Sequence, residues 1–311
     1  MSTQPLARRL VHPAALQKIG SLTLESRQPM QGSVAGKHRS PHRGSSVEFA
    51  EYREYVPGDD LRRLDWRAYG RSDRFYVKEF EADTNLRLCL VVDGSGSMRY
   101  GAPDNPGNGD SPMSKLEYAG RMASLLAFVA IRQGDAAGLT VAAARGNRHL
   151  PPKRRPSHLG VLQDALEDVE AKGDTNLVQS LHEVAERTRQ RALVVVLSDL
   201  FSDPEELGRA FQHLRHRKHD VVAFHLLERR ELEFQFDRTT RFVDLEGGAA
   251  IIADPSVMAR HYRTALEQYQ SGLADAVRRA NVDYHRALLD VPPEDVLAQF
   301  LLARMAGKKR R

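Results

Sequence analysis

Three oxygen-bearing side chains at alternate positions are the residues of this chain best suited to hold a metal ion. Residues 86–92 form a largely apolar run that leads directly into Asp93-Gly94-Ser95-Gly96-Ser97. The two glycines let the turn fold tightly enough for Asp93, Ser95 and Ser97 to face one point. One carboxylate and two hydroxyls are the kind of hard oxygen ligand that Mg²⁺ or Ca²⁺ accepts. This segment therefore predicts a divalent-metal site at the end of a strand.

Two further oxygen ligands follow along the chain. Thr175 precedes a helical pattern, and Asp199 follows a second apolar run, residues 193–197. In an open parallel sheet, ligands bind outside the carboxyl ends of the strands, near the point where the strand order reverses. We therefore expect Asp93, Thr175 and Asp199 to converge. A plainer interpretation is that these residues are ordinary helix N-caps, and that Thr175 or Asp174 simply caps the next helix.

The order Asp-x-Ser-x-Ser, loop Thr and strand-end Asp resembles the metal-ion-dependent adhesion site of von Willebrand factor A domains. The resemblance implies that Ser95, Ser97 and Thr175 bind the metal through their hydroxyls. It also implies that Asp93 and Asp199 act largely through water or through hydrogen bonds to the ligands. We expect Mg²⁺ as the metal, with Mn²⁺ or Ca²⁺ as alternatives.

The rest of the pattern places this turn in an α/β fold. Apolar runs predict strands at residues 86–92, 138–144, 192–197, 221–227 and 240–245. Helical periodicity and start signals indicate helices at residues 115–133, 159–169, 177–189, from 203 onward, 255–280 and from 291 to the C-terminal tail. Strands that alternate with helices of this length pair in parallel. We therefore expect a doubly wound, mostly parallel sheet of the von Willebrand factor A-like, Rossmann type.

A second unusual segment lies upstream of the metal-binding turn. Residues 52–81 hold seven aromatic residues, a third of all the Phe, Trp and Tyr in the chain, among closely spaced Arg, Asp and Glu. This density indicates an ordered, packed segment rather than a linker. The segment resembles the signature of domain-of-unknown-function family number fifty-eight, which is carried here by Glu48-Phe49, Arg53-Glu54-Tyr55-Val56-Pro57-Gly58-Asp59-Asp60, Arg62 and Asp65-Trp66-Arg67.

The family resemblance carries expectations about architecture and partners. Members join this signature to a von Willebrand factor A-like domain, and their genes commonly lie beside those of MoxR-type AAA+ ATPases. The resemblance therefore implies a MoxR-type ATPase as partner, with this chain as its adaptor or co-chaperone. The role of residues 52–81 stays open between two alternatives. They form either a structural clasp, in which Trp66 packs on the sheet, or a docking surface, since aromatic residues and Arg suit both.

We expect the chain to divide into three segments. Residues 1–84 form an N-terminal extension that contains the signature, and residues 85–255 form the metal-binding domain. Residues 256–311 form a helical segment that packs on the same domain.

A Gly-, Pro- and Asn-rich loop at residues 99–112 follows the metal-binding turn. Its Asp104 and Asp110 are either extra metal ligands or, more simply, solvated turn residues, because Asp is favoured in turns.

Composition and charge exclude several other classes. The chain has 311 residues, with 46 Lys and Arg against 41 Asp and Glu, so its net charge of +5 is small. No basic stripe with interleaved aromatics recurs, and nucleic-acid binding is not expected. The longest apolar stretch, residues 122–131, is too short to span a membrane, and the N-terminus has no signal-peptide pattern. The lone Cys89 offers no intrachain disulfide, so we expect a cytoplasmic protein.

The main competing class is a Mg²⁺-dependent phosphoester hydrolase, because a metal at a strand end also serves phosphoryl transfer. Aspartate-based phosphatases of the haloacid dehalogenase type use a second Asp, two residues after the nucleophile, as general acid. That position is Ser95 here. Neither a Gly-x-x-x-x-Gly-Lys-[Ser/Thr] loop nor a Gly-x-Ser-x-Gly elbow is present. We therefore expect a non-enzymatic module that binds an acidic side chain of a partner protein through the metal.

Overall fold

The computed structural model describes residues 13–27, 49–54, 69–70, 75–80, 86–101, 113–144, 146–234, 236 and 238–309. The chain forms two compact units, one from Met1–Arg27 with Arg87–Arg311 and the other from Gln28–Leu86. In the smaller unit, β1 (Phe49–Glu54) pairs antiparallel with β2 (Tyr76–Phe80). Trp66 and most of the family signature lie outside the described residues, and so do Asp104 and Asp110.

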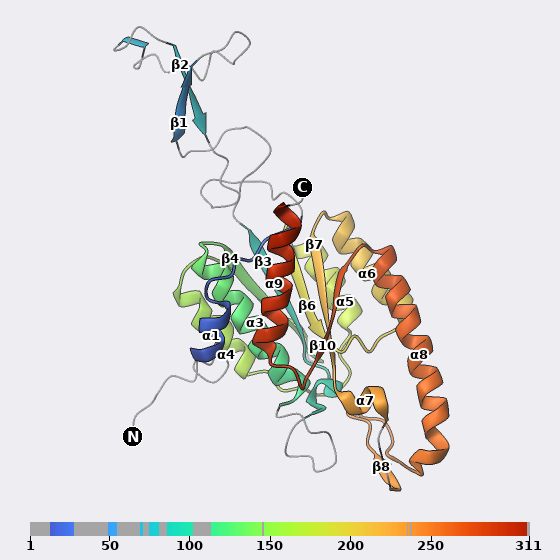
Figure 1. Cartoon of the computed structure of the whole chain (residues 1–311). Helices are drawn as coiled ribbons and strands as arrows, with labels where there is room; N and C mark the ends of the chain where they lie inside the picture. Colours follow the sequence, from blue (N-terminus) through green and yellow to red (C-terminus); the bar gives the residue numbers. More distant parts are fainter. Residues whose placement is uncertain are drawn as a thin grey trace, which may run out of the picture. The chain divides into compact units, whose positions relative to one another are not determined.

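The larger unit is built on a six-stranded sheet with the strand order β10-β7-β6-β3-β4-β5 (Figure 1). All neighbours in it are parallel except β4 and β5, which are antiparallel. This arrangement confirms the predicted doubly wound, mostly parallel sheet. The strands are β3 (Arg87–Asp93), β4 (Ala136–Ala142), β5 (Arg148–Lys153), β6 (Leu193–Ser198), β7 (Asp220–Leu227) and β10 (Asp283–Leu288).

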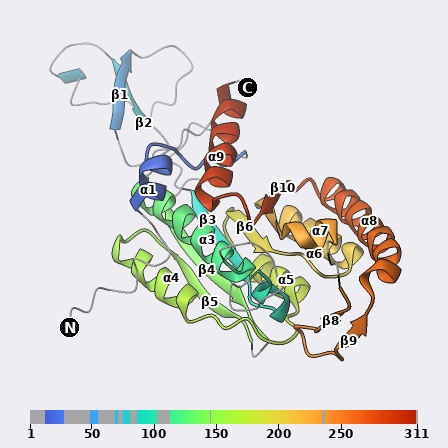
Figure 2. The same ribbon diagram turned by 60° about the horizontal axis from the view of Figure 1, so that its bottom comes forward.

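Helices cover both faces of the sheet (Figures 1 and 2). On one face, α3 packs across the central strands and contacts α4 and α9, and α1 lies against α9. On the other face α5 and α6 pack side by side, and α8 packs on α6. These helices are α1 (Pro13–Ile19), α3 (Lys115–Arg132), α4 (Ser157–Glu167), α5 (Leu177–Arg187), α6 (Pro204–His216), α8 (Pro255–Arg279) and α9 (Pro293–Lys309).

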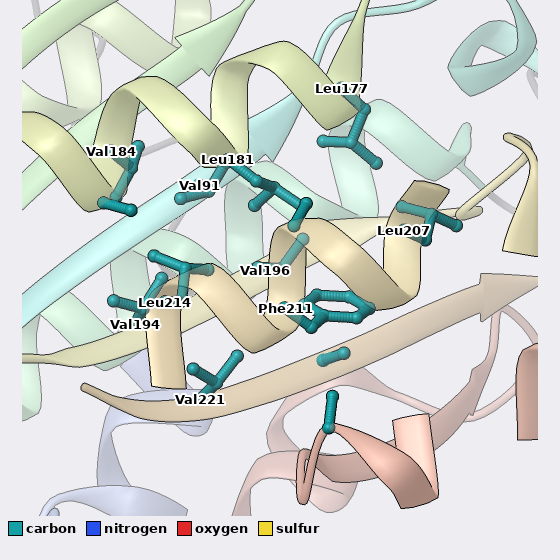
Figure 3. Packing of buried hydrophobic residues seen from close by; sticks show 14 of the residues in the cluster. Val91, Leu177, Leu181, Val184, Val194, Val196, Leu207, Phe211, Leu214 and Val221 are labelled. Carbon is teal, nitrogen blue, oxygen red and sulfur yellow. The ribbon is translucent and has the colours of Figure 1, made fainter. Parts of the chain in front are cut away.

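The apolar core beneath α5 and α6 explains why the central strands read as continuous apolar runs. Every residue of β6 is buried, as expected for a parallel strand that is covered on both faces. Val194 and Val196 point to the α5–α6 side, where Leu181 and Phe211 pack on them (Figure 3). The cluster fixes the central strands, and their carboxyl ends carry the candidate site.

Local sequence signals set the helix starts near the site. Ser114 caps α3 and forms a reciprocal capping box with Glu117. Asp203 caps α6 by accepting hydrogen bonds from the backbone N–H groups of Glu205 and Glu206, and Pro204 occupies the first turn as the sequence predicts.

Three features of the sheet differ from the sequence-based expectation. The predicted strand at residues 240–245 is short, and β8 (Thr240–Phe242) pairs antiparallel with β9 (Ile251–Ala253) in a separate ribbon. The two edge strands, β5 and β10, escape prediction for a physical reason. An edge strand tolerates exposed and proline residues, and β5 contains Pro151 and Pro152 while β10 exposes Arg286. Among the described residues, the helices include none that combines the length and the apolarity needed to cross a membrane.

Candidate metal centre

The candidate site lies where the strand order of the sheet reverses. Asp93 is the last residue of β3, and Asp199 directly follows β6, its hydrogen-bonded neighbour. The chain leaves β3 toward β4 on one side and returns later to β6 on the other, so the crevice between their carboxyl ends is the switch point of the fold. Thr175 reaches the same place from the loop before α5.

Asp93 is the hub of the hydrogen bonds in the site and is only 3% exposed. Its Oδ1 accepts from the backbone N–H of Ser95 and from the Thr175 hydroxyl, both at 2.9 Å. Its Oδ2 accepts from the Ser198 hydroxyl at 2.6 Å. Burial and the nearby Asp199 carboxylate raise the pKa of Asp93, against these three hydrogen bonds. The ionised form therefore carries a cost that a bound cation would offset.

The two serine hydroxyls are hydrogen-bonded to each other, at a spacing that would also suit two adjacent ligands of a hard divalent cation. Ser95 Oγ and Ser97 Oγ lie 3.0 Å apart. Two adjacent ligands of an octahedral Mg²⁺, each about 2.0–2.1 Å from the ion, are about 2.8–3.0 Å apart. The described residues contain no group of three or more His, Cys, Asp or Glu side chains placed for a metal. The candidate donors here are instead the hydroxyls of Ser95, Ser97 and Thr175, with the carboxylates of Asp93 and Asp199 beside them. That chemistry fits Mg²⁺ or Mn²⁺ rather than zinc.

Close backbone approaches hold the turn that carries these hydroxyls. Gly94 donates its N–H to the carbonyl of Ala142 at 2.9 Å, and Gly96 donates to the carbonyl of Gly173 at 2.8 Å. A Cβ atom on Gly96 would lie only 2.0 Å from the carbonyl oxygen of Leu245. The glycines in this motif are therefore needed because other backbone segments press against the turn.

Asp199 is paired with a buried lysine that the sequence analysis did not identify. Lys115, 2% exposed, places its Nζ 3.1 Å from Asp199 Oδ2 and 2.6 Å from Glu231 Oε1. Burial would raise the pKa of Asp199, but the Lys115 ammonium and the hydrogen bonds that the carboxylate accepts together outweigh burial and lower that pKa. For Lys115, burial opposes the charged form, and the two carboxylates outweigh it and raise its pKa. A lysine in the first turn of α3 is unfavourable for the helix dipole, and this unusual position was the sequence feature that could have identified Lys115 as a site residue.

The structure also separates capping from site roles around α5. Asn176 caps this helix by accepting a hydrogen bond from the Gln179 N–H at 2.8 Å, whereas the Thr175 hydroxyl is turned to Asp93. Ser198 is a second residue that the sequence analysis missed, because a Ser at the end of a strand has many ordinary roles.

A cavity of about 620 Å³ opens beside the site. Ser97, Lys115 and Asp199 line one side of it. The other walls come from α7 (Arg229–Glu233), the segment 243–246 and α8, and they combine apolar side chains with the carboxylates of Glu231, Asp244 and Glu246. A ligand that approaches the hydroxyl pair from this direction therefore meets apolar side chains and several carboxylates on its way.

Comparison with known proteins identifies the family of this chain. Residues 51–272, well over half of its length, match the family model described as "Protein of unknown function DUF58". The chain belongs to this family. The match confirms the resemblance read from the signature between Glu48 and Arg67. An uncharacterized protein of Mycobacterium bovis and one of Mycobacterium tuberculosis are both 25% identical to the DUF58 chain over 294 residues. Each alignment covers 89% of this chain and 89% of the relative.

Solved structures give fold similarities at low identity. The conserved hypothetical protein BatB of Bacteroides thetaiotaomicron has a TM-score of 0.47 at 16% identity, covering 72% of this chain and 100% of BatB. The VWA domain of SpRpn10 has a TM-score of 0.39 at 14% identity, covering 70% of this chain and 95% of that domain. Because both TM-scores are low, the fold described here rests on the order and direction of the strands themselves.

Proposed function

We propose that this DUF58 protein is a metal-dependent protein-interaction module that binds a carboxylate of a partner through a divalent cation. Ser95, Ser97 and Thr175 would hold the cation through their hydroxyls. Asp93 and Asp199 would support it through water or hydrogen bonds. The observation that carries the proposal is the 3.0 Å separation of the two serine hydroxyls beside a buried, hydrogen-bonded carboxylate.

Electrostatics explain why such a site would seek an acidic ligand. Two carboxylates roughly neutralise a divalent cation, and neutral hydroxyls leave it electrophilic. Lys115 adds a positive charge next to Asp199, which weakens the hold of Asp199 on the ion. A carboxylate from outside would restore the balance. The bound cation would thus supply Lewis acidity and offset the cost of the Asp93 charge, while the chain positions the hydroxyls.

The partner that we propose is a MoxR-type AAA+ ATPase, with this chain as adaptor or co-chaperone. This part of the proposal rests on the family signature, because the site itself specifies only an acidic ligand. Co-purification of the tagged chain with the ATPase, in Mg²⁺ and in EDTA, tests it. Recovery of the ATPase in Mg²⁺ alone is expected, and equal recovery in EDTA would contradict metal-dependent binding.

The hydrolase alternative is less well supported by the geometry of the site. Both oxygens of Asp93 accept hydrogen bonds, so this carboxylate is poorly placed to attack a phosphoester. Ser95 stands where a general acid would be needed. We expect no turnover of a panel of phosphoesters with Mg²⁺ or Mn²⁺.

Calorimetry with Mg²⁺ and Mn²⁺ tests the metal site directly. We expect weak binding, with a Kd on the order of 10⁻⁴ to 10⁻³ M, as for other oxygen sites of low charge. Asp93→Asn should abolish the heat. The matched control is Asp168→Asn, which removes an equal charge from an exposed carboxylate that pairs with Arg148. If the wild-type chain shows no heat that depends on Asp93, the metal site is wrong.

A further inference from the structure

A carboxylate of the chain itself lies at the candidate site. Glu246 belongs to the loop between β8 and β9. Glu246 and Ser97 line the same cavity, and the Glu246 carboxylate lies close enough to the Ser97 hydroxyl to interact with it. The same hydroxyl is also within hydrogen-bonding reach of Asp199. Glu246 therefore occupies the side of Ser97 that faces the cavity, where an external carboxylate would have to approach.

The backbone of this loop is seated on the metal-binding turn. The Leu245 carbonyl and the Glu246 N–H are the groups that a Cβ atom on Gly96 would strike, at 2.0 Å and 3.3 Å. Glu246 donates its N–H to Asp244 Oδ1 at 2.8 Å, and Gly247 follows with φ +111°. These backbone contacts hold Glu246 beside Ser97 in the free protein.

The Glu246 carboxylate has several negatively charged neighbours, and a cation would stabilise it. Its carboxylate lies close enough to Asp174, Asp199 and Asp244 to feel the repulsion of all three. Lys115 is occupied by Asp199 and Glu231. A divalent ion held by Ser95 and Ser97 would offset this repulsion, since each of these carboxylates would be attracted to its double positive charge.

We propose that Glu246 is an internal ligand of the metal and fills the coordination position that a partner carboxylate takes on binding. This inference rests on the proposed function, and it adds a specific consequence. In the free protein the metal is completed by the chain itself, so a partner carboxylate must displace Glu246 from the ion. The partner's acidic residue therefore binds by exchange with an equivalent group and not at a vacant position.

Water-proton relaxation by bound Mn²⁺ tests the assignment, because it increases with the number of water molecules on the ion. In Glu246→Ala, a water should replace the lost carboxylate, so the relaxivity per bound Mn²⁺ should rise. The Mn²⁺ affinity should fall roughly tenfold, because one charged ligand is lost from a site of low charge. Acetate, used as a probe carboxylate, should lower the relaxivity of Glu246→Ala at concentrations that leave the wild-type chain unchanged.

The matched control is Asp244→Asn, which removes one negative charge from the same loop but keeps an oxygen that can accept the Glu246 N–H. Its relaxivity should match that of the wild type, with Mn²⁺ affinity within about threefold, since a neighbouring charge acts only at a distance. Melting curves in EDTA confirm that both variants are folded before Mn²⁺ is added.

The outcomes separate this inference from the proposed function. If Mn²⁺ binds the wild type in an Asp93-dependent way, and Glu246→Ala changes neither relaxivity nor affinity, Glu246 is not a ligand and the metal site stands. If Asp244→Asn raises the relaxivity as much as Glu246→Ala does, the effect belongs to loop charge and the inference also fails. If the wild type binds no Mn²⁺ through Asp93, both the metal site and its internal ligand are wrong.

Discussion

Replacing the buried Lys115 by Met should destabilise the protein strongly in the absence of metal. The ammonium is the partner of Asp199, whose side chain is 6% exposed, and of Glu231, whose side chain is 25% exposed. Met fills a similar volume, so the main loss is the charge. Glu231 can be rehydrated, but Asp199 would remain a buried carboxylate beside Asp93 with its cation removed.

The magnitude follows from what remains buried. Breaking a buried ion pair by removing one partner costs about 3–5 kcal/mol, because the remaining charge is left uncompensated. At roughly 2–4 °C per kcal/mol for a unit of about 150–250 residues, the Tm should fall by about 6–20 °C. Excess Mg²⁺ should raise the Tm of Lys115→Met more than that of the wild type, since a divalent ion near Asp199 replaces part of the missing charge.

Thermal unfolding in EDTA and in Mg²⁺ measures both effects. Arg229→Met is the control, because Arg229 also lies at this side of the unit but pairs with Asp290 while 54% exposed. Loss of such a surface pair should cost no more than about 1 kcal/mol. A Lys115→Met protein that melts within about 2 °C of the wild type in EDTA would show that Asp199 is not held by this charge, and the electrostatic account of the site would fall.

Three further predictions concern the site, the pH dependence and the core. Asp93→Asn should have a higher Tm than the wild type in EDTA, because burial destabilises the charged carboxylate. Mg²⁺ should no longer stabilise this variant. A Tm below that of the wild type in EDTA would contradict the prediction. Burial first, then Arg217 and His213, lower the pKa of His219 to about 4. This pKa lies below the unfolded value of about 6.5, so His219 stabilises the folded protein above pH 6.5. As the pH falls toward 4, the free energy of unfolding should decrease by up to about 3 kcal/mol. Chemical denaturation of the wild type and of His219→Asn across this pH range measures the decrease. Phe211→Ala should cost about 3–5 kcal/mol in the same denaturation assay, because its ring is fully buried between α6 and the sheet.

The central part of the fold could be predicted from the sequence because its physical demands are local. β6 is covered on both faces, so its residues had to be apolar throughout, and the run 193–197 showed this directly. The edge strand β10 could not be recognised in the same way. It is half-buried and carries an exposed Arg286, and its pairing with β7 is decided by the crossover through α8 and not by its own composition.

The candidate site likewise contains residues that the sequence predicts and residues that it does not. Asp93, Ser95 and Ser97 are close in sequence, so their spacing alone predicts one cluster. Lys115 and Glu246 come from segments distant in the sequence. Their distance along the chain from the Asp-x-Ser-x-Ser motif matches no known pattern, so the sequence does not predict that they lie near it. Only the packing of α3 and of the 243–248 loop against the turn brings them to the site.

The turn that carries the serine hydroxyls is held from two different sides, and this decides which part of the site can respond to a partner. On the sheet side, hydrogen bonds from Gly94 to Ala142 and from Gly96 to Gly173 fix its backbone. On the cavity side, Leu245 touches it through a close backbone contact, and short exposed strands support that loop. The sheet side is anchored in the core, so an incoming carboxylate can displace only the loop side. Exchange of the proposed internal ligand would then move the 243–248 loop while the hydroxyls of Ser95 and Ser97 keep the metal in place.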